Sequence, residues 1–410
     1  MVKISSAGRK DTSSDCWIRL EIRKTGGITV EQQSKVQSMY GRSISQTISR
    51  MLEFYDIRNA HLIITDSGAL PFVLCARIEA AIKACFPDKH EDYLSPIHPN
   101  NVYTVDKSRL RRSRLYVPGD HAKLIINAGL FKADGVILDL EDAVAPDEKR
   151  SARFLVRNAL REVDFFQAER MVRINQLPMG LEDLDYIVPH GVHTVLIPKC
   201  EHAETIQEVE ARIQELQIKH KTKDPVFLLP IIESALGVVN AYRIAMASTS
   251  TVALTIGLED FTADIGAERT LEGRESFFAR SEIVIAARAA DIQPIDSVFS
   301  DVGDEEGLKA SIAEAKSLGF EGKGCIHPSQ IPIVHEGFAP SKRDIAKAKK
   351  ITLAMKAARE KGSGVVSLGT KMIDPPVVKR AERVLKLAIQ NQQIPANWIE
   401  EEEDKDEGTN

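Results

Sequence analysis

Residues 226–266, VFLLPIIESALGVVNAYRIAMASTSTVALTIGLEDFTADIG, decide the fold, because they hold two apolar runs that each lead into acidic residues. The first run, residues 227–232, ends at Glu233, and the second, residues 252–256, is followed closely by Asp260. Continuous apolar runs separated by a helix-length segment are typical of buried parallel strands in βαβ units. The stretch therefore predicts neighbouring parallel strands whose carboxyl ends carry acidic side chains.

These two acidic side chains are candidates for a metal site. α/β barrels place their chemistry at the carboxyl ends of the strands, where Glu233 and Asp260 would converge. Mg²⁺ takes a few carboxylate oxygens and leaves its other positions to water and substrate. Either acid could instead cap the helix that follows it. The occurrence of both in the same register favours a magnesium site.

The composition of the chain restricts its class. A length of 410 residues exceeds a typical single domain, so two units are expected. The formal net charge of −5 gives no support for nucleic-acid binding, and no apolar run is long enough to predict a membrane span. Residues 1–15 lack the apolar segment of a secretory signal, and the five cysteines show no metal-type spacing. We therefore expect a cytoplasmic protein with reduced thiols.

From residue 109 onward, strand-like runs alternate with helix-length segments. The eight runs are residues 115–117, 135–138, 171–175, 194–197, 227–232, 252–256, 297–299 and 324–326. This alternation predicts an α/β fold, a (β/α)₈ TIM-like barrel over residues 109–337, with a doubly wound parallel sheet as the alternative. Residues 338–396 predict a C-terminal helical extension that could cover a neighbouring subunit, and the acidic residues 397–410 predict a disordered tail.

Residues 1–86 predict a separate small α+β domain. Its expected elements are strands at 17–22, 60–65 and 71–74, a helix over 30–55 that Gly41 interrupts, and a closing helix over 77–86. Residues 87–108 are rich in proline, asparagine, histidine and charge, which predicts an interdomain linker. Ser13 and Ser14 precede the first strand, in a setting that is ordinarily a plain loop.

Polar residues recur at the predicted carboxyl ends of the barrel strands. They are Asp139, Glu141, Asp142, Arg173, Lys199, Glu233 and Asp260. One or two could be helix caps, but so many around one rim indicate a site. Arginine can hold a carboxylate with two parallel hydrogen bonds, and a bound metal can polarise a carbonyl group. These groups suit cleavage of a carbon–carbon bond in a β-hydroxyacyl thioester, in which a base removes the hydroxyl proton.

Residues 1–86 resemble the acyl carrier (gamma) subunit of citrate lyase. The matching motifs are AG followed by SSD and IRL, then YGRSISQTISRMLEFYDIRNAHLIITDSGAL and CARIEAAI. The resemblance implies that a phosphoribosyl-dephospho-coenzyme A arm is attached to Ser13 and carries an acyl thioester. One extra residue before this serine, relative to the usual spacing, leaves Ser14 as the alternative.

Residues 109–390 resemble the beta subunit of citrate lyase, within the aldolase/citrate lyase family that also holds malyl- and citramalyl-coenzyme A lyases. The matching motifs are RRSRLYVPG, DGVILDLEDAVAPDEKRSAR, VRIN, LIPK, IIES, IGLEDFTADIG, FARSEIVIAARAA, EGKGCIHPSQI and GVVSLGTKMIDPPVVKRA. The resemblance implies that Glu233 and Asp260 hold Mg²⁺ and that Arg173 binds the substrate carboxylate. It also places Asp374 as a general base that reaches in from a neighbouring subunit.

Further roles follow from the same resemblance. Arg112 should lie close to the thioester or phosphate arm. Glu141 and Asp142 should lie beside the metal ligands. Lys199 should face the rim and contact the substrate.

The expected activity is Mg²⁺-dependent cleavage of a citryl thioester to an acetyl thioester and oxaloacetate. Cleavage of a citramalyl thioester to pyruvate is the close alternative, and a non-catalytic acyl-carrier scaffold is the alternative from another class. The resemblance implies two kinds of partner, a separate transferase (alpha) subunit that loads the arm and further copies of this chain in a trimer or hexamer.

Overall fold

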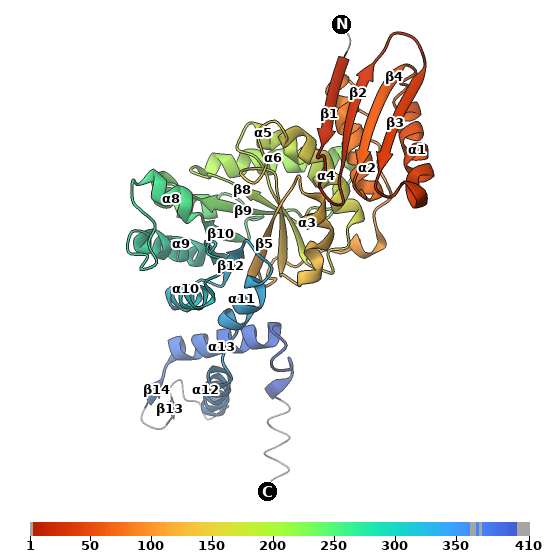
Figure 1. Cartoon of the computed structure of the whole chain (residues 1–410). Coiled ribbons are helices and arrows are strands. Elements are labelled where there is room, and N and C mark those ends of the chain that lie inside the picture. Colours follow the sequence, from red (N-terminus) through yellow and green to blue (C-terminus); the bar gives the residue numbers. More distant parts are fainter. Residues whose placement is uncertain (1–2, 361–365, 369–370, 400–410) are drawn as a thin grey trace. The chain divides into compact units, whose positions relative to one another are not determined.

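The computed structural model describes residues 3–360, 366–368 and 371–399. These residues belong to two compact units, Met1–Val334 and His335–Asn410 (Figure 1). The first unit holds a small four-stranded domain and the barrel, and the second is mostly helical. Within the described residues, no helix is both long enough and apolar enough to cross a membrane.

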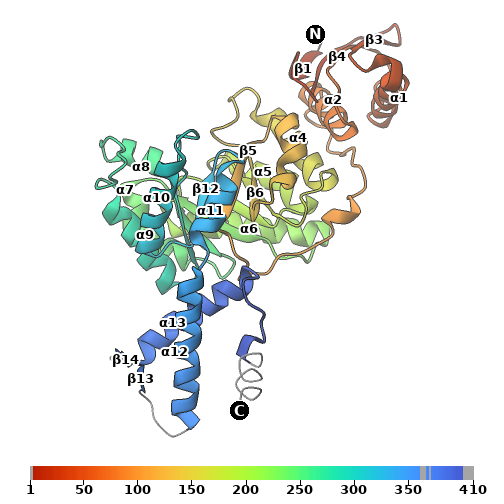
Figure 2. The ribbon, with the colours of Figure 1, turned by 60° about the horizontal axis from the view of Figure 1, so that its bottom comes forward.

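The large domain of the first unit is a closed barrel of eight parallel strands. The strands are β5 (Ser113–Pro118), β6 (Gly135–Asp139), β7 (Glu169–Arg173), β8 (Thr194–Ile197), β9 (Phe227–Ile232), β10 (Ala253–Ile256), β11 (Gln293–Asp296) and β12 (Gly322–Cys325). Each pairs in parallel with the next, and β12 pairs with β5 to close the ring, which Figures 1 and 2 show. The predicted barrel is therefore confirmed, and a doubly wound sheet is excluded.

Helices follow the barrel strands and surround them (Figure 2). They are α3 (Ala122–Asn127), α4 (Lys149–Glu162), α5 (Met179–Ile187), α6 (Ala203–His220), α7 (Ala235–Ala245), α8 (Leu258–Asp264), α9 (Phe277–Ala289), α10 (Glu305–Leu318) and α11 (Gln330–Phe338). The barrel interior is filled by apolar side chains such as Ile137, Met171, Leu229 and Ile295. It is a packed core, so any site must lie at the rim.

The small domain packs two helices against a four-stranded sheet. The sheet has the order β1 (Lys3–Gly8), β2 (Cys16–Ile22), β4 (Ala60–Asp66) and β3 (Ile28–Ser34), and the helices are α1 (Gln37–Phe54) and α2 (Pro71–Cys85). β2 and β4 supply the alternating buried residues Ile18, Leu20, Leu62 and Ile64. This alternation of apolar and polar residues made both strands predictable from the sequence.

Several expected elements differ from the structure. Residues 30–34 belong to β3, a polar strand that pairs in parallel with β4, and they are not helical. Residues 71–74 form the first turn of α2, because Pro71 has the fixed φ that suits a helix start and lacks a proton that would need a partner there. Gly41 lies inside α1 and does not interrupt it. The strand expected at 297–299 lies instead at Gln293–Asp296, and β1 was not expected.

The segment 87–108, predicted as a linker, is packed along the barrel. The side-chain amide of Asn101 donates to the carbonyl oxygens of Leu160 and Val163 at 3.2 and 2.7 Å. The Tyr103 hydroxyl donates to the carbonyl of Ala168 at 2.6 Å, and Val105 is buried in a small apolar cluster. These contacts fix the path that leads from the small domain to β5.

The second unit contains α12 (Lys342–Glu360), a hairpin of β13 (Val366–Leu368) and β14 (Lys371–Ile373), and α13 (Pro375–Gln390). α12 and α13 share an apolar core that includes Ile351, Met355, Leu385 and Trp398. The expected helical extension is therefore present. Most of the predicted acidic tail, residues 400–410, lies outside the described residues.

A buried charge cluster at the end of β11 offers a test of barrel stability. Asp296 Oδ2 accepts hydrogen bonds from Lys323 Nζ at 2.6 Å and from Arg280 Nη2 at 3.1 Å. Burial would raise the pKa of Asp296, but attraction to the two cations outweighs it and lowers the pKa. The change Asp296→Asn should reduce the free energy of unfolding by about 3–5 kcal/mol, because it leaves the buried Lys323 without its counter-ion and Arg280 with Glu314 alone. Urea denaturation measures the loss.

The sign of the pH dependence follows from the lowered pKa. The stability that Asp296 contributes is present above its unfolded pKa of about 4 and is lost as the pH falls through the folded value. The unfolding free energy should therefore depend less on pH below about 4 in Asp296→Asn than in the parent. The exposed Asp291, just before β11, is the matched control, and Asp291→Asn should cost less than about 0.5 kcal/mol. Equal losses in the two variants would contradict the buried cluster's role.

Candidate active site

The centre of the acidic rim is an ion pair between the last residues of two adjacent strands. Arg173 ends β7 and Asp139 ends β6, and the two are partners in the strand register. Arg173 donates from Nε and Nη2 to the two oxygens of Asp139, at 2.7 and 2.6 Å. Asp139 also accepts from the backbone amides of Glu141 and Ala143, at 3.0 and 3.2 Å. One carboxylate thus fixes both the arginine and the loop that follows β6.

Two further carboxylates lie on the other side of this guanidinium. Arg173 Nη1 is 3.0 Å from Glu141 Oε2, outside hydrogen-bond alignment, and 3.7 Å from Asp142 Oδ2. The Tyr116 ring faces the Arg173 guanidinium, whose carbon lies 5.4 Å from the ring centroid. Burial would lower the pKa of Arg173, but Asp139 and Glu141 raise it. Because Asp139 takes the Nε–Nη2 edge, Arg173 can offer an incoming anion only its Nη1–Nη2 edge.

Lys199 lies on the rim between two of its carboxylates, Glu141 and Asp260. It lies two residues past the end of β8, with a φ of 47° in the left-handed region, and its Nζ lies 3.5 Å from Asp260 Oδ1 and 3.8 Å from Glu141 Oε1. Partial burial would lower the pKa of Lys199, but the surrounding carboxylates raise it. The ammonium therefore remains charged at neutral pH and can balance carboxylates or contact an anionic substrate.

Glu233, which follows β9, has the least favourable surroundings for a negative charge among these acids. Its side chain is 5% exposed, and Oε2 has no hydrogen-bond partner among the described residues. Burial raises its pKa to about 8, with smaller contributions from the negative charges of Asp260 and Glu141. Burial likewise raises the pKa of Glu141. Asp260 approaches from the first turn of α8.

These residues fit a divalent cation. A buried carboxylate with an unpaired oxygen beside two other carboxylates is unfavourable by itself, and a cation among them would relieve the repulsion. The described residues contain no group of three or more acidic, histidine or cysteine side chains placed to hold a metal ion by themselves. Glu233 and Asp260 would suit Mg²⁺, which can use only one or two carboxylates and take its remaining oxygens from water and substrate.

Arg112 lies elsewhere. It directly precedes β5, at the amino end of the strands, whereas the acidic rim lies at their carboxyl ends. Its Nε and Nη2 donate to the carboxylate of Asp134, at 2.9 and 2.7 Å. Arg112 thus lies at the opposite end of the barrel from the acidic rim, because it precedes a strand that the rim residues follow, and its expected proximity to the thioester or phosphate arm stays a prediction.

Asp374 belongs to the second unit, where it caps α13. Its Oδ1 accepts from the backbone amide of Val377 at 3.1 Å. This is the helix-cap geometry that Asp-Pro-Pro at a helix start favours. The cap uses one carboxylate oxygen, so the other oxygen can still accept a proton.

The serine pair lies in the turn between β1 and β2. Ser13 is exposed, whereas Ser14 has a φ of 64° and donates its backbone amide to the carbonyl of Ser67 at 3.1 Å. Asp15 is fully buried and bonds both oxygens to Arg77. The conformation therefore holds the turn rigidly and leaves Ser13 as the more accessible hydroxyl.

Three residues of the rim had no assigned role from the sequence. Gln176, just after the VRIN motif, donates from Nε2 to Glu141 Oε1 at 3.1 Å. Tyr116 supports Arg173, and Gly257 lies directly against Glu233, since a Cβ on Gly257 would come within 2.6 Å of Glu233 Cγ. Proximity to the motifs was their only sequence signal, because the contacts join different strands.

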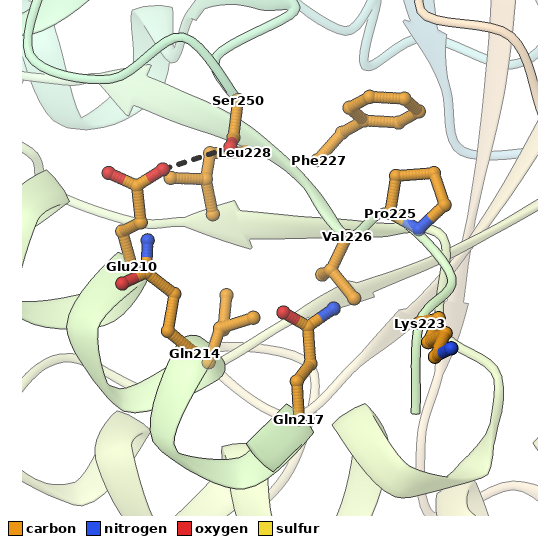
Figure 3. A pocket seen from close by; sticks show the side chains of 10 residues that line it. Glu210, Gln214, Gln217, Lys223, Pro225, Val226, Phe227, Leu228 and Ser250 are labelled. Carbon is orange, nitrogen blue, oxygen red and sulfur yellow. Dashed lines mark hydrogen bonds between the residues drawn. The ribbon is translucent and has the colours of Figure 1, made fainter. Parts of the chain in front are cut away.

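A cavity of about 210 Å³ lies at the other end of the barrel (Figure 3). It is lined by residues of α6 and by Pro225, Val226 and Phe227 at the amino end of β9. Glu210 accepts a hydrogen bond from the Ser250 hydroxyl at 2.9 Å in its wall. Its place at the amino ends of the strands separates it from the acidic rim.

A (β/α)₈ barrel with acids, an arginine and a lysine at the carboxyl ends of its strands has the groups to bind a metal ion and an anionic substrate. Residues 112–328 match the family described as HpcH/HpaI aldolase/citrate lyase, and residues 7–85 match the malonate decarboxylase delta subunit (MdcD), an acyl carrier family. The chain belongs to the HpcH/HpaI aldolase/citrate lyase family and is a carbon–carbon lyase. A carrier-like domain precedes the lyase in the same chain.

Curated relatives agree with this assignment. The chain is 40% identical over 301 residues to the citrate lyase subunit beta of Leuconostoc mesenteroides, covering 72% of this chain and 100% of that one. It is 34% identical over 295 residues to the mitochondrial citramalyl-CoA lyase of Rattus norvegicus, covering 68% and 86%. The expected resemblance to the citrate lyase beta subunit is confirmed.

A solved structure is similar as well. Protein CitE of Mycobacterium tuberculosis, in complex with magnesium, acetoacetate and coenzyme A, is 31% identical, with a TM-score of 0.56. The match covers 69% of this chain and 99% of that one.

The contact between Gly257 and Glu233 gives a prediction about the rim. The φ of Gly257 is −103°, which alanine adopts freely, so Gly257→Ala adds only the methyl group that pushes Glu233 aside. We expect carbon–carbon cleavage to slow by about 10- to 100-fold, because small displacements of catalytic groups are costly, while the thermal midpoint changes little. Steady-state kinetics and thermal unfolding measure the two effects. Gly303→Ala, on an exposed loop, is the control, and a comparable loss of rate there would refute the explanation.

Proposed function

We propose that this chain cleaves a citryl thioester, carried on its own N-terminal domain, into an acetyl thioester and oxaloacetate. One observation carries the proposal: a carrier-like domain stands in the same chain as a barrel whose rim joins Glu233, Asp260, Arg173 and Lys199. The 40% identity to a citrate lyase beta subunit over that subunit's whole length supports the choice of substrate.

The proposed mechanism is a retro-aldol (Claisen-type) cleavage. The Nη1–Nη2 edge of Arg173, which faces Glu141 and Asp142, is proposed to hold a carboxylate of the acyl group, and Lys199 supplies a second positive charge. Asp374 takes the proton from the tertiary hydroxyl, the carbon–carbon bond breaks, and its electrons pass to the thioester enolate, which takes up a proton to give the acetyl thioester. Mg²⁺, held by Glu233 and Asp260, would supply Lewis-acid polarisation of the oxygen that becomes the oxo group. Glu141 and Asp142 hold Arg173 and Lys199 in place.

The arm is proposed to be phosphoribosyl-dephospho-coenzyme A on Ser13. The exposed position of Ser13 at the tip of a rigid turn supports this attachment, as does the match of residues 7–85 to a carrier family. The chain would need a separate transferase (alpha) subunit to load the arm. Ser14 is the alternative site, but its left-handed backbone and its bond to Ser67 make it less accessible.

The active unit is proposed to be a homo-oligomer, a trimer or hexamer, in which Asp374 serves a neighbouring barrel. Asp374 belongs to the second compact unit, and α12 separates it from the barrel strands in the sequence. Large apolar side chains are also exposed on α7 and α9, two helices that pack together, and Val239 and Phe278 are 81% and 73% exposed. Surfaces of this kind favour contact with another protein chain.

Citramalyl-thioester cleavage is the second candidate, because the chain is 34% identical to citramalyl-CoA lyases. The two acyl groups differ at one substituent, which bears a carboxylate in the citryl group and is a methyl group in the citramalyl group. A non-catalytic carrier scaffold is the third, but it would not explain why Glu233 is left buried with an unpaired oxygen at the rim.

The activity and its metal can be tested together. We expect the chain to release oxaloacetate from citryl-coenzyme A in Mg²⁺ and to be inactive in EDTA. Glu233→Gln and Asp260→Asn should each lower kcat by about 100-fold or more, because each removes a charged metal ligand. Coupled dehydrogenase assays that distinguish oxaloacetate from pyruvate identify the product. Full turnover in EDTA would refute the metal, and faster turnover of citramalyl-coenzyme A would reassign the substrate.

The attachment site can be located by mass spectrometry. Intact protein from its native host should carry the mass of a phosphoribosyl-dephospho-coenzyme A group, and Ser13→Ala should remove it. Ser14→Ala is the neighbouring control and should retain the group. A modification that survives in Ser13→Ala but not in Ser14→Ala would move the site by one residue.

Mixing of inactive chains tests the shared site. Asp374→Asn and Glu233→Gln are each expected to be inactive, because one lacks the base and the other a metal ligand. Co-assembled oligomers should recover part of the activity, since some sites then combine an intact Glu233 with a neighbour's intact Asp374. Native mass spectrometry verifies that mixed oligomers form. If verified mixtures stay inactive, Asp374 does not act across subunits.

A further inference from the structure

We propose that the carrier-like domain is docked permanently on the barrel, with its serine turn beside the active-site rim, so that each arm serves the barrel of its own chain. The inference rests on the proposed function for the identity of the arm. The docking itself rests on contacts within the first compact unit.

Arg9 ties the start of the serine turn to the barrel. It lies four residues before Ser13 and bonds to the carboxylate of Asp120. Its Nη1 also lies 2.7 Å from Nε2 of His121, whose Nδ1 is 2.6 Å from the second oxygen of Asp120. The Asp120 side chain is fully buried, although it belongs to a loop at the barrel rim. Burial would raise the pKa of Asp120, but the bonds from His121 and Arg9 lower it.

Arg77 of α2 ties the end of the same turn to the same place. It donates from Nε and Nη2 to Asp15, at 3.0 and 2.8 Å, and Asp15 lies two residues after Ser13. The same Nη2 donates to the backbone carbonyl of Asp120 at 2.9 Å, and Nη1 donates to the Ser151 hydroxyl at 3.2 Å. The Arg77 and Asp15 side chains are both fully buried. The turn is therefore held to the barrel on both sides of the serines.

A second, separate contact joins the helices of the two domains. Arg157 of α4 donates from Nη2 and Nη1 to the two oxygens of Glu79 of α2, at 2.5 and 3.1 Å, and both side chains are fully buried. Asn158 donates to the carbonyl of Phe72 at 3.0 Å beside this pair. A bidentate ion pair that is excluded from water is typical of the core of a stable interface. In a transient encounter between a carrier and an enzyme, charged side chains stay hydrated at the rim of the interface. The domains are thus built to remain together.

The docking point is continuous with the active site. Asp120 lies two residues past the end of β5, and Gly119 between them donates its amide to the carbonyl of Asp139 at 2.8 Å. Asp139 is the residue that holds Arg173. The turn that carries the attachment serine therefore lies at the rim formed by the carboxyl ends of β5, β6 and β7. An arm anchored there presents its acyl group at a high effective concentration without movement of either domain.

Arg9→Ala, compared with Lys10→Ala, tests the docking. Both changes remove one positive charge from the same loop, but Lys10 is exposed and stacks on Trp17 within its own domain. Arg9→Ala should speed hydrogen exchange of the amides of residues 9–15 and 119–125 and slow cleavage of an arm-borne acyl group by about tenfold, the effect of one charge-assisted hydrogen bond. Cleavage of free citryl-coenzyme A should be unchanged, and Lys10→Ala should change neither. If Arg9→Ala behaves like Lys10→Ala, the docking is refuted.

Mixing of two chains tests service within one chain. The first chain, Glu233→Gln, bears a loaded arm on an inactive barrel. The second, Ser13→Ala/Ser14→Ala, has an intact barrel without an arm. In the mixture, the loaded acyl group should be cleaved at least about tenfold more slowly than in the loaded parent. Cleavage at the parent rate would show that arms serve other barrels and would overturn the inference.

Failure of the proposed function gives a different result. If the parent cleaves no thioester, the lyase assignment fails, whereas faster exchange in Arg9→Ala alone would still demonstrate the docking. If the parent cleaves free and arm-borne substrate but Arg9→Ala shows parental exchange and rate, the docking fails and the lyase assignment stands.

Discussion

The bond between Arg173 and Asp139 is the interaction on which the rest of the site depends. It joins the last residues of two adjacent strands, and Asp139 at the same time accepts from two backbone amides of the loop after β6. That loop carries Glu141, which faces both Arg173 and Lys199. The backbone of Asp139 also accepts from Gly119, which leads to the carrier's docking point. Asp139 therefore positions Arg173 and the neighbouring acids through its carboxylate, and the loop at Gly119 through its backbone carbonyl.

The rim is a balance of charges that is incomplete without a ligand. Glu141, Asp142, Glu233 and Asp260 face Arg173 and Lys199, so negative groups outnumber positive ones. Glu233 bears most of the imbalance, because it is buried and has an unpaired oxygen. An excess of carboxylates disfavours an added anion and favours a cation.

The fusion of carrier and lyase changes how an acyl group reaches the barrel. Separate carrier and enzyme chains must find one another by diffusion, and their contacts must be weak enough to break. Here the contacts of Arg77 and Arg157 are fully buried, which suits two domains that fold together. Under the proposed function, movement would then be left to the arm and to a transferase that loads it.

Much of the barrel could be predicted from the sequence. Apolar runs such as 227–232 and 135–138 identify strands, because strands buried on both faces need continuous apolar residues. Short strands with polar residues, such as β11 with its buried Asp296, gave a weaker signal, and its position was misplaced by a few residues. The pattern of residues 30–34 predicts helix, because only the pairing of β3 with β4 makes these residues a strand.

The candidate site divides in the same way. The chemical types at the rim, Arg173, Lys199, Glu233 and Asp260, were determined by the sequence, since each lies at or shortly past the end of a predictable strand. Only the tertiary structure decided that Asp139 occupies one edge of Arg173, that Gly257 makes room for Glu233, and that Arg112 lies at the opposite end of the barrel. It alone also brought Arg9 and Arg77 to Asp120, over more than forty residues of intervening chain. Pairing between distant side chains depends on strand closure and on domain packing, and neither leaves a local pattern in the sequence.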